Sequence, residues 1–442
     1  MSGALDQSGK PHAEPAEATE RRVLFLQGPL SPFFRLAGDH LKAMGHEVFR
    51  INFCAGDWFH WHGGECTSFK GSSEDWPQFI ETYLTQNRIT DLVLHGDQRL
   101  YHRIAIRKAR DIGVYIAVTE LGALRTGWMT LERNGLSTLS HFPSNPEQIS
   151  EIARTAEEID LQPRYPSSFW LQTAPDVTYN LLNVFLKPLY PNYQQHTIYP
   201  PVLEYMRGAG RLVSEDKRNR TAEEELQKLQ SAKTDYFLLP LQLEGDFQLR
   251  RHSNFDSFSE VIETVFASFS SHASRDVHIV LKSHPLDVGF EGWPGVTKEL
   301  ASKHGLADRV HFLDGGGLAK PFETAKGVVT LNSTAGLEAI QQGVPVKTLV
   351  PAHYDIAGLT HQGELSDFWK APQRPDAELF DSYIKALAAT TQIRGTIHNA
   401  EGVKVAAKNL AERVSARSLN PLGAFVDPPP RLEKARKIGV PL

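Results

Sequence analysis

This 442-residue sequence predicts an α/β protein built from two units, each a parallel sheet with helices on its faces. Two observations predict this class. Short apolar runs alternate with stretches in which apolar residues recur at helical spacing, and the whole alternation occurs twice, from residue 21 and again from residue 236. The length also exceeds what a single core usually holds, so two or three domains are expected.

The first unit is predicted to contain four strands joined by helices. Apolar runs predict the strands at residues 23–27, 48–52, 91–95 and 114–118. Apolar positions at helical spacing predict helices over residues 33–44, 76–87 and 101–111. Gly45 follows the first of these helices and ends it. The order strand-helix-strand is typical of a parallel, doubly wound sheet.

The second unit repeats this order. Its strands are predicted at residues 236–239, 277–281, 310–313, 327–331 and 344–349. Its helices are predicted at residues 255–269, 296–304, 318–324 and 335–342. Two Rossmann-like units in one chain, with phosphate-type turns in the second, describe the glycosyltransferase B architecture. In that architecture the donor nucleotide lies on the second unit and the acceptor on the first, and the two face each other across a cleft.

These patterns divide the chain into five expected segments. They are a polar, disordered leader (1–20), an acceptor unit (21–143), a helical connection (144–233), a nucleotide-sugar unit (234–400), and a C-terminal helix with a basic tail (401–442). The leader has no apolar core of the kind that a secretory signal contains.

Bulk properties exclude several classes of function. A formal charge of -5 argues against a general nucleic-acid binder, which would carry a basic excess. Cys54 and Cys66 are the two cysteines, and two thiols alone form neither a disulfide framework nor a structural zinc site. The sequence contains no run of about eighteen apolar residues, which is the length needed to span a bilayer. A cytoplasmic protein is therefore expected.

Two strand ends of the second unit suit a nucleotide phosphate. His284 follows one predicted strand, and Ser333 and Thr334 stand between another strand and a helix. Carboxyl ends of strands line the ligand crevice of an open α/β sheet. A helix N-terminus offers N–H donors and a positive dipole end, and a histidine adds a donor. The pair indicates a nucleotide-sugar transferase; the alternative is an ordinary His-Pro turn beside an ordinary N-cap.

Carboxylates at other strand ends are candidate catalytic groups. Asp97 and Glu120 follow successive strands of the first unit, so both would face the cleft. Asp97 could instead cap the next helix. Asp246 follows the first strand of the second unit, where it would be a nucleophile or base, or simply a residue of a surface turn. There is no Asp-x-Asp pair to hold a metal-diphosphate, so a metal-independent, monophosphate-linked donor is expected, with no metal site and no bound cofactor.

The connection between the units has two interpretations. It is rich in proline and aromatic residues, which fits a helical link between domains. The alternative is a surface that meets a membrane or a lipid acceptor, because several cations could contact anionic headgroups. These cations are Arg207, Arg211, Lys217, Arg218 and Arg220. The tail from Pro428 is expected to be solvated, and it carries Arg431, Lys434, Arg436 and Lys437.

An ordered series of motifs carries a family resemblance across residues 23–349. In the first unit the motifs are Leu26-Gln27-Gly28-Pro29, Arg50-Ile51-Asn52-Phe53-Cys54, Gly96-Asp97-x-Arg99-x-Tyr101-His102 and Trp128-x-Thr130-x-Glu132. In the second they are Pro240-Leu241-Gln242, Asp246-x-Gln248, His284-Pro285 and Asn332-Ser333-Thr334. The sequence thereby resembles the capsular polysaccharide β-Kdo transferases, bacterial enzymes that build a Kdo linker on a lysophospholipid.

The resemblance implies a function and a set of site residues. It implies CMP-β-Kdo as donor, retention at the anomeric carbon, and a lysophospholipid or glycolipid acceptor at the anionic inner membrane. It also implies capsule assembly and export proteins as partners. Asp246 would be the nucleophile and Glu120 the acid/base, with Asp97 as a further catalytic carboxylate. The implied nucleotide-binding residues are His284, Pro285, Lys282, Asn332, Ser333, Thr334 and Gln242. The implied acceptor-binding residues are Gly28, Arg99, Tyr101, His102 and Arg125.

Two rival functions fit the same residues. One is transfer of another CMP-linked ulosonic acid. The other is a non-catalytic role in capsule export or assembly, although such a scaffold would have no need of Asp246, Glu120 and His284 together.

Overall fold

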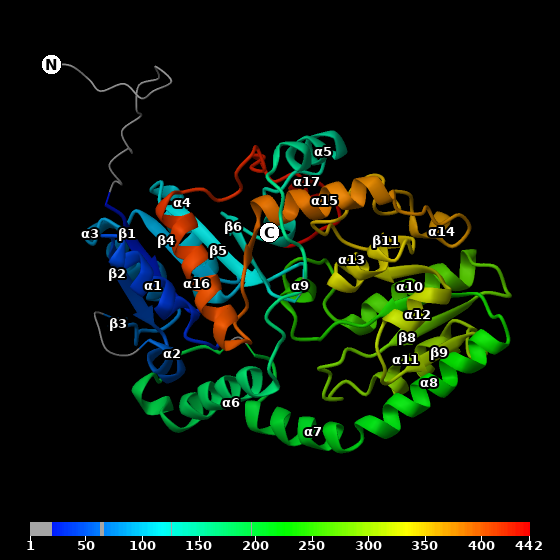
Figure 1. Ribbon diagram of the computed structural model, residues 1–442. Coiled ribbons are helices and arrows are strands. Elements are labelled where there is room, and N and C mark those ends of the chain that lie inside the picture. Colours follow the sequence, from blue (N-terminus) through cyan, green and yellow to red (C-terminus); the bar gives the residue numbers. More distant parts are fainter. Residues whose placement is uncertain (1–19, 62–65, 125, 196) are drawn as a thin grey trace, which may run out of the picture.

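The computed structural model describes residues 20–61, 66–124, 126–195 and 197–442. The leader expected at residues 1–20 therefore lies almost entirely outside the described residues. The described chain forms two sheets, each with helices on both faces, and the two units stand side by side (Figure 1). The predicted α/β class with two Rossmann-like units is confirmed.

The first sheet has seven strands in the order β12-β6-β5-β4-β1-β2-β3. Five run parallel to one another: β1 (Arg22–Phe25), β2 (Glu47–Asn52), β3 (Thr67–Ser68), β4 (Asp91–His95) and β5 (Tyr115–Leu121). Alternate side chains of β1 enter different cores: Phe25 packs toward α1 (Phe33–Ala43) and α16 (Ala400–Ser415), and Leu24 toward α3 (Trp76–Gln86) and α4 (Leu100–Asp111). All four strands predicted for this unit are confirmed.

The second sheet is parallel throughout, in the order β11-β10-β7-β8-β9. Its strands are β7 (Tyr236–Pro240), β8 (His278–Lys282), β9 (Val310–Leu313), β10 (Ala325–Thr330) and β11 (Val346–Thr348). One face packs on α10 (Phe258–His272) and α11 (Trp293–Lys303), and the other on α13 (Thr334–Gln341) and α15 (Ala377–Thr390). All five strands predicted for this unit are also confirmed. The short helix α12 (Ala319–Thr324) lies between β9 and β10.

The end of the chain returns to the first unit. β6 (Trp128–Arg133) is antiparallel to β5, and β12 (Gln392–Arg394) is antiparallel to β6. The return therefore begins earlier than the boundary expected at residue 400. β12 was missed because three residues are too few to show a strand period.

The tail expected to be solvated is anchored instead. Arg431 is buried, and its guanidinium donates to the carbonyl oxygens of Ala352, Phe142, Pro143 and His353. Lys434 Nζ lies 2.6 Å from Asp355 Oδ2. A buried arginine with this many carbonyl acceptors ties α17 (Leu432–Lys437) to both units, which corrects the expectation of a free basic end.

The connection between the units is helical, which confirms the interpretation of this segment as a helical link between domains. It contains α5 (Pro146–Thr155), α6 (Phe169–Phe185), the short turn η2 (Lys187–Leu189), α7 (Pro201–Val213) and α8 (Glu215–Ser231). α6 packs on α2 (Ala55–His60) of the first unit, and α7 and α8 run along the second (Figure 1). Within the described residues, no helix is both long enough and apolar enough to cross a membrane.

Two of the five cations expected to form a basic surface on this connection are instead paired with a carboxylate. Arg211 makes a bidentate pair with Asp314, with nitrogen–oxygen distances of 3.0 and 2.7 Å, and Arg218 lies 3.6 Å from the same carboxylate. Arg207 lies over the ring of Phe290 and donates to a backbone carbonyl. Arg211 and Arg218 thus hold α7 and α8 to the second unit and their charges are paired, whereas Arg207, Lys217 and Arg220 are exposed.

Candidate active site

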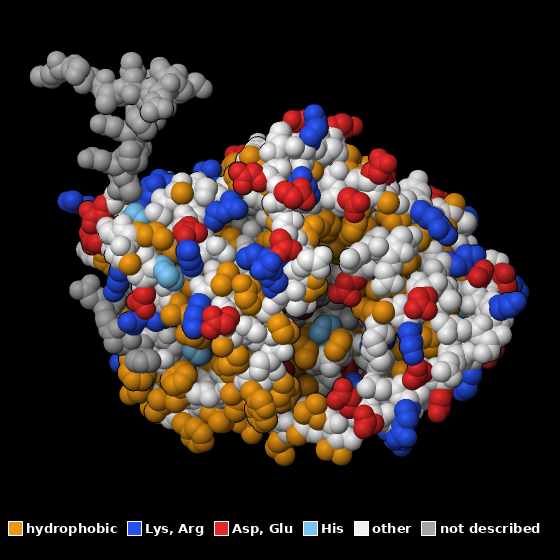
Figure 2. Space-filling model, viewed as in Figure 1, with side chains coloured by type: hydrophobic (Ala, Val, Ile, Leu, Met, Phe, Trp, Pro, Cys, Tyr) orange, Lys and Arg blue, Asp and Glu red, His pale blue; other side chains and the backbone are white. Residues whose placement is uncertain are grey.

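The carboxyl ends of the strands in both sheets face the space between the two units, where the molecular surface is hollowed (Figure 2). β4 and β5 bring His95, Asp97 and Glu120 to this cleft from the first unit. The loop after β7 brings Asp246 from the second unit. The predicted catalytic carboxylates are therefore gathered by the fold at one place.

Asp97 is buried and holds a loop rather than capping a helix. Its Oδ2 accepts the backbone N–H of Leu136 at 2.9 Å, and the N-cap of α4 is Arg99. Its Oδ1 lies 3.8 Å from Nε2 of His252, a buried residue of the second unit. The other ring nitrogen of His252 hydrogen-bonds the hydroxyl of Thr138. Asp97 thus helps to fix the position of one unit against the other.

Glu120 stands at the end of β5 with its side chain 46% exposed. Its Oε1 accepts the N–H of Leu121 at 3.2 Å and lies 3.7 Å from Nε2 of His95. Although the side chain is partly open to water, the protein around it in the cleft reduces its hydration and raises the pKa of Glu120 to about 7. The charges of Asp246 and Asp97 raise this pKa further, and the Leu121 N–H and the charge of Arg99 lower it. A water-accessible carboxyl with a pKa near neutrality is suited to general acid/base chemistry.

Asp246 is the N-cap of the short helix α9 (Phe247–Arg250). Its Oδ1 accepts the N–H of Gln248 at 2.9 Å. Burial raises the pKa of Asp246, whereas hydrogen bonds from Gln248 and Gln242 and the charge of His252 lower it. The turn alternative is correct in that Asp246 caps a turn of helix.

A chain of hydrogen bonds joins the two units beside these carboxylates. Gln248 Oε1 accepts from Ser137 Oγ of the first unit at 2.6 Å and from Asn332 Nδ2 of the second at 2.9 Å. Gln242 Nε2 in turn lies 3.4 Å from Asn332 Oδ1. Sequence reasoning missed Ser137 and Thr138, which lie in the 3₁₀ turn η1 (Ser137–Leu139), and His252, which lies in a loop; none of them belongs to a motif. Gln248 belongs to the Asp-x-Gln pattern and could have been selected from it.

The wall of the second unit carries the predicted nucleotide-binding residues. His284 Nδ1 accepts the N–H of Leu286 at 3.1 Å, so in the neutral ring the hydrogen is on Nε2, which can donate. Pro285 follows in an exposed turn. The ordinary His-Pro turn is therefore present, and it also orients a donor.

Ser333 is the N-cap of α13, and its Oγ accepts the N–H of Ala335 at 3.2 Å. Thr334 begins the helix. The ordinary N-cap alternative is thus what the structure contains. A phosphate at this helix N-terminus would take over the bond that Ser333 now makes.

Three residues predicted to bind the nucleotide are buried: Lys282, Gln242 and Asn332. Lys282 Nζ donates to the backbone oxygen of Ser283 at 3.0 Å, and burial lowers its pKa to about 8, with Asp314 raising it and Arg218 and Arg211 lowering it. In this structure the three residues are buried at or near strand ends, and their contact with a nucleotide stays a prediction.

The predicted acceptor-binding residues are mostly structural. Tyr101 is buried and stacks on Phe53 with ring centroids 4.5 Å apart, and His102 is fully buried with Nδ1 2.7 Å from the carbonyl oxygen of Gly96. Both therefore lack access to an acceptor, which corrects the expectation. Arg99 is nearer the cleft, since it lowers the pKa of Glu120, and its Nη1 donates to Gln27 Oε1 at 3.0 Å. Arg125 lies outside the described residues.

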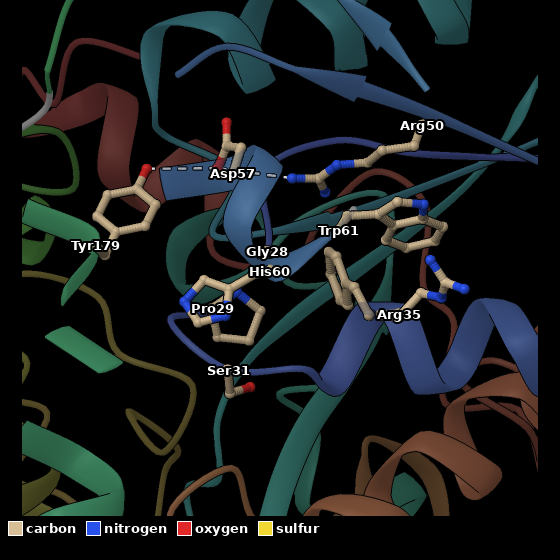
Figure 3. Close-up of a pocket in the computed structure, with 10 residues that line it drawn as sticks. Gly28, Pro29, Ser31, Arg35, Arg50, Asp57, His60, Trp61 and Tyr179 are labelled. Carbon is tan, nitrogen blue, oxygen red and sulfur yellow. Dashed lines mark hydrogen bonds and ion pairs between the residues drawn. The ribbon is translucent and has the colours of Figure 1, made fainter. Parts of the chain in front are cut away.

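A small pocket opens at the end of β1 in the first unit (Figure 3). Arg50, Asp57 and Tyr179 point toward one another there, with 3.6 Å between Arg50 Nη2 and Asp57 Oδ1 and 3.4 Å between Tyr179 Oη and the same oxygen. Gly28 also lines it, and a Cβ on Gly28 would lie 2.8 Å from the ring of Phe34. The close neighbour of this glycine is thus Phe34, and the polar groups of the pocket attach α6 to the first unit.

Two Rossmann-like sheets whose strands have their carboxyl ends toward one cleft define a protein of glycosyltransferase B architecture. The chain belongs to the capsule polysaccharide biosynthesis protein family, whose model matches residues 90–398. It is 31% identical over 386 residues to capsule polysaccharide modification protein LipB of Neisseria meningitidis serogroup B, covering 85% of this chain and 91% of that protein. It is 28% identical over 385 residues to capsule polysaccharide export protein KpsS of Escherichia coli, covering 86% and 97%.

Among solved structures, the chain is similar to Thermosulfurimonas dismutans KpsC, a beta Kdo 2,7 transferase. The TM-score is 0.44 at 14% identity, over 88% of this chain and 99% of that one.

Proposed function

We propose that the protein is a retaining β-Kdo glycosyltransferase of capsular polysaccharide biosynthesis. It moves Kdo from CMP-β-Kdo to a lysophosphatidylglycerol-type lipid or to a Kdo acceptor. One observation carries the proposal: the fold brings two carboxylates from different units to one cleft, Glu120 at the end of β5 and Asp246 in the loop after β7. The capsule family match, together with the resemblance of the ordered motifs to the β-Kdo transferases, supports Kdo as the sugar and CMP-β-Kdo as the donor.

In this proposal the two carboxylates act in succession. Asp246 attacks the anomeric carbon of Kdo, the bond from that carbon to the phosphate oxygen breaks, and CMP leaves with the electron pair. Glu120 then takes the proton from the acceptor hydroxyl as its oxygen attacks the same carbon, and the bond to Asp246 breaks. Two displacements return the original anomeric configuration.

The wall of the second unit would stabilise the departing nucleotide. His284 Nε2 and the N-terminus of α13 at Ser333 and Thr334 would donate to the CMP phosphate, which gains charge as it leaves. A monophosphate needs no metal clamp of the Asp-x-Asp type, so we expect binding of CMP without a divalent metal. The acceptor would place the enzyme at the anionic inner face of the membrane, with capsule assembly and export proteins as its partners.

The test is release of CMP from CMP-β-Kdo by the purified protein when acceptor is added. The expected result is CMP release that depends on acceptor, with the Kdo-bearing product identified by mass, and no release from Asp246→Asn. Release from a different CMP-linked ulosonic acid, and none from CMP-β-Kdo, would assign another donor sugar. No release with any donor, from a folded protein that binds none of them, would favour the export or assembly role.

A further inference from the structure

The helical connection between the units carries an unusual concentration of exposed apolar side chains. Among the described residues, 13 of the 22 large hydrophobic side chains that are exposed lie within residues 169–213. Trp170, Phe185 and Val213 are 72%, 74% and 90% exposed. Figure 2 shows hydrophobic side chains gathered along the lower edge of the molecule, where α6 and α7 lie. We call this surface the apolar face; its most prominent members are Phe169, Trp170, Phe185, Leu189, Met206 and Val213.

The two helices of the apolar face are firmly held by their other sides. Asn183 Oδ1 of α6 accepts the N–H of Gly56 at 2.9 Å, and Asn180 Nδ2 donates to Tyr205 Oη of α7 at 2.8 Å. Arg211 pairs α7 with Asp314 of the second unit. Because the polar contacts use the inner sides, the apolar side chains are turned outward by the packing itself. A contiguous exposed apolar surface of this kind marks an interaction site.

The charges around the apolar face favour an anionic lipid surface as its partner. Among the described residues from 169 to 213, neither of the two carboxylates, Asp176 and Glu204, is exposed. The exposed cations of this stretch are Lys187, between α6 and α7, and Arg207. Aromatic side chains prefer the membrane interface, and nearby cations attract anionic headgroups. Asp176 and Glu204 are half-buried, Asp176 Oδ2 accepts from Tyr205 Oη at 2.8 Å, and exposed carboxylates begin only after this stretch, at Glu215.

The apolar face also borders the candidate active site. Ile198, itself exposed, lies beside the loop after β7, since a Cβ on Gly245 would be 3.4 Å from Ile198 Cγ1. Gly245 immediately precedes Asp246. A surface that rests on lipid here would place the edge of the bilayer next to the candidate nucleophile.

We infer that the apolar face of α6 and α7 docks on an anionic lipid bilayer and brings the cleft to the membrane surface. Phe169, Trp170, Phe185 and Met206 enter the headgroup region, and Lys187 and Arg207 contact the anionic headgroups. The docking itself does not depend on the function proposed above. The role of the docking, which is to bring the cleft to a lipid acceptor, rests on that function. The face that contacts lipid is therefore apolar and lies before Ser214, and the arginines bound to Asp314 take no part.

The experiment is flotation of the full chain with vesicles of phosphatidylglycerol and phosphatidylcholine. The triple variant Trp170→Glu, Phe185→Glu and Val213→Glu should lose at least about tenfold in vesicle partitioning, because three apolar side chains become charged. A matched control changes Met44, Ile112 and Leu442 to Glu, which are exposed apolar residues elsewhere on the molecule, and should bind as the original protein does. Unchanged thermal unfolding of both variants would show that they are folded.

Two further measurements separate the outcomes. Lys187→Glu should weaken binding to vesicles that contain phosphatidylglycerol and leave binding to phosphatidylcholine alone unaffected. Undiminished vesicle binding by the folded triple variant would overturn the inference. A second result would also overturn the inference: the original protein does not bind vesicles but self-associates, and the triple variant does not self-associate. The apolar face would then join two copies of the chain. Transfer of the sugar to a short-chain, water-soluble acceptor should persist in the triple variant. If neither the triple variant nor the original protein transfers the sugar, the proposed function is refuted, but the inference that the apolar face docks on lipid is not.

Discussion

The two walls of the cleft differ in the chemistry they offer. The first unit presents a carboxyl with a pKa near neutrality, Glu120, and the buried Asp97 that is held by a loop N–H. The second presents hydrogen-bond donors, His284 and the N-terminus of α13, together with Asp246 at the boundary. In the proposed function, proton transfer and anion binding would thus be divided between the units. The division implies that neither unit alone would be active, and each wall can be altered while the other is measured.

The largest effect is expected from Asp246→Asn. Asparagine is an equally good N-cap, so α9 and the fold should remain, but the amide cannot act as a nucleophile. Transfer should fall by at least about 10³-fold while CMP affinity is nearly unchanged, as measured by product formation and by calorimetry. A Kdo mass increment on Asp246 in a trapped reaction would support the assignment. Full turnover would instead move the nucleophile to Asp97 or Glu120.

A smaller loss, of about 10²-fold, is expected from Glu120→Gln. As a base, Glu120 acts when ionised, and its pKa is raised to about 7, so the rate of the original protein should rise with pH and level off above about pH 7. The variant should lack this rise. Rate profiles from pH 5 to 9 test the point, and a rise that survives in the variant would assign it to another group.

His284→Ala tests the opposite wall. It should weaken CMP binding by about 1–3 kcal/mol, the scale for losing a hydrogen bond to a charged group, and leave the pH dependence of the rate in place. His272→Ala, on the surface of α10, is the matched control. Calorimetry with and without EDTA measures both, and a strict requirement for a divalent metal would contradict the expected metal-free binding.

The smallest effect concerns the hydrogen bonds that join the walls. Gln248→Ala removes the acceptor shared by Ser137 and Asn332 and should lower the free energy of unfolding by about 1–2 kcal/mol. Gln248→Glu keeps an acceptor for both donors and should cost less. Urea unfolding compares the two variants. Equal losses would show that the shared acceptor is not what matters at this position.

The nine predicted strands could be recognised because most of them contain a short apolar run, as in β7 with its buried residues Tyr236 to Leu239, whereas β3, β6 and β12 were not predicted. The strand ends with His284 and Ser333 were predictable for the same reason, since each follows such a run. Tyr101 and His102 were predicted to bind the acceptor because they belong to a motif. A motif identifies residues but does not show whether a helix directs their side chains into the core or into the cleft. His252 was missed because its partners, Thr138 and Asp97, come from the other unit, and contacts between distant loops leave no local pattern.

The return of the chain to the first sheet has a consequence for how the protein folds while it is being synthesised. β12 and α16 complete the first unit, yet they lie after the whole second unit in the sequence. Until residue 415 has left the ribosome, β6 is an unpaired sheet edge and the α1 face of the first core lacks its covering helix. An N-terminal domain usually finishes folding during synthesis, but the first unit of this protein cannot do so before the second unit has been synthesised. The second unit can complete its sheet first, and the first unit must wait, partly uncovered, for the last stretch of the chain.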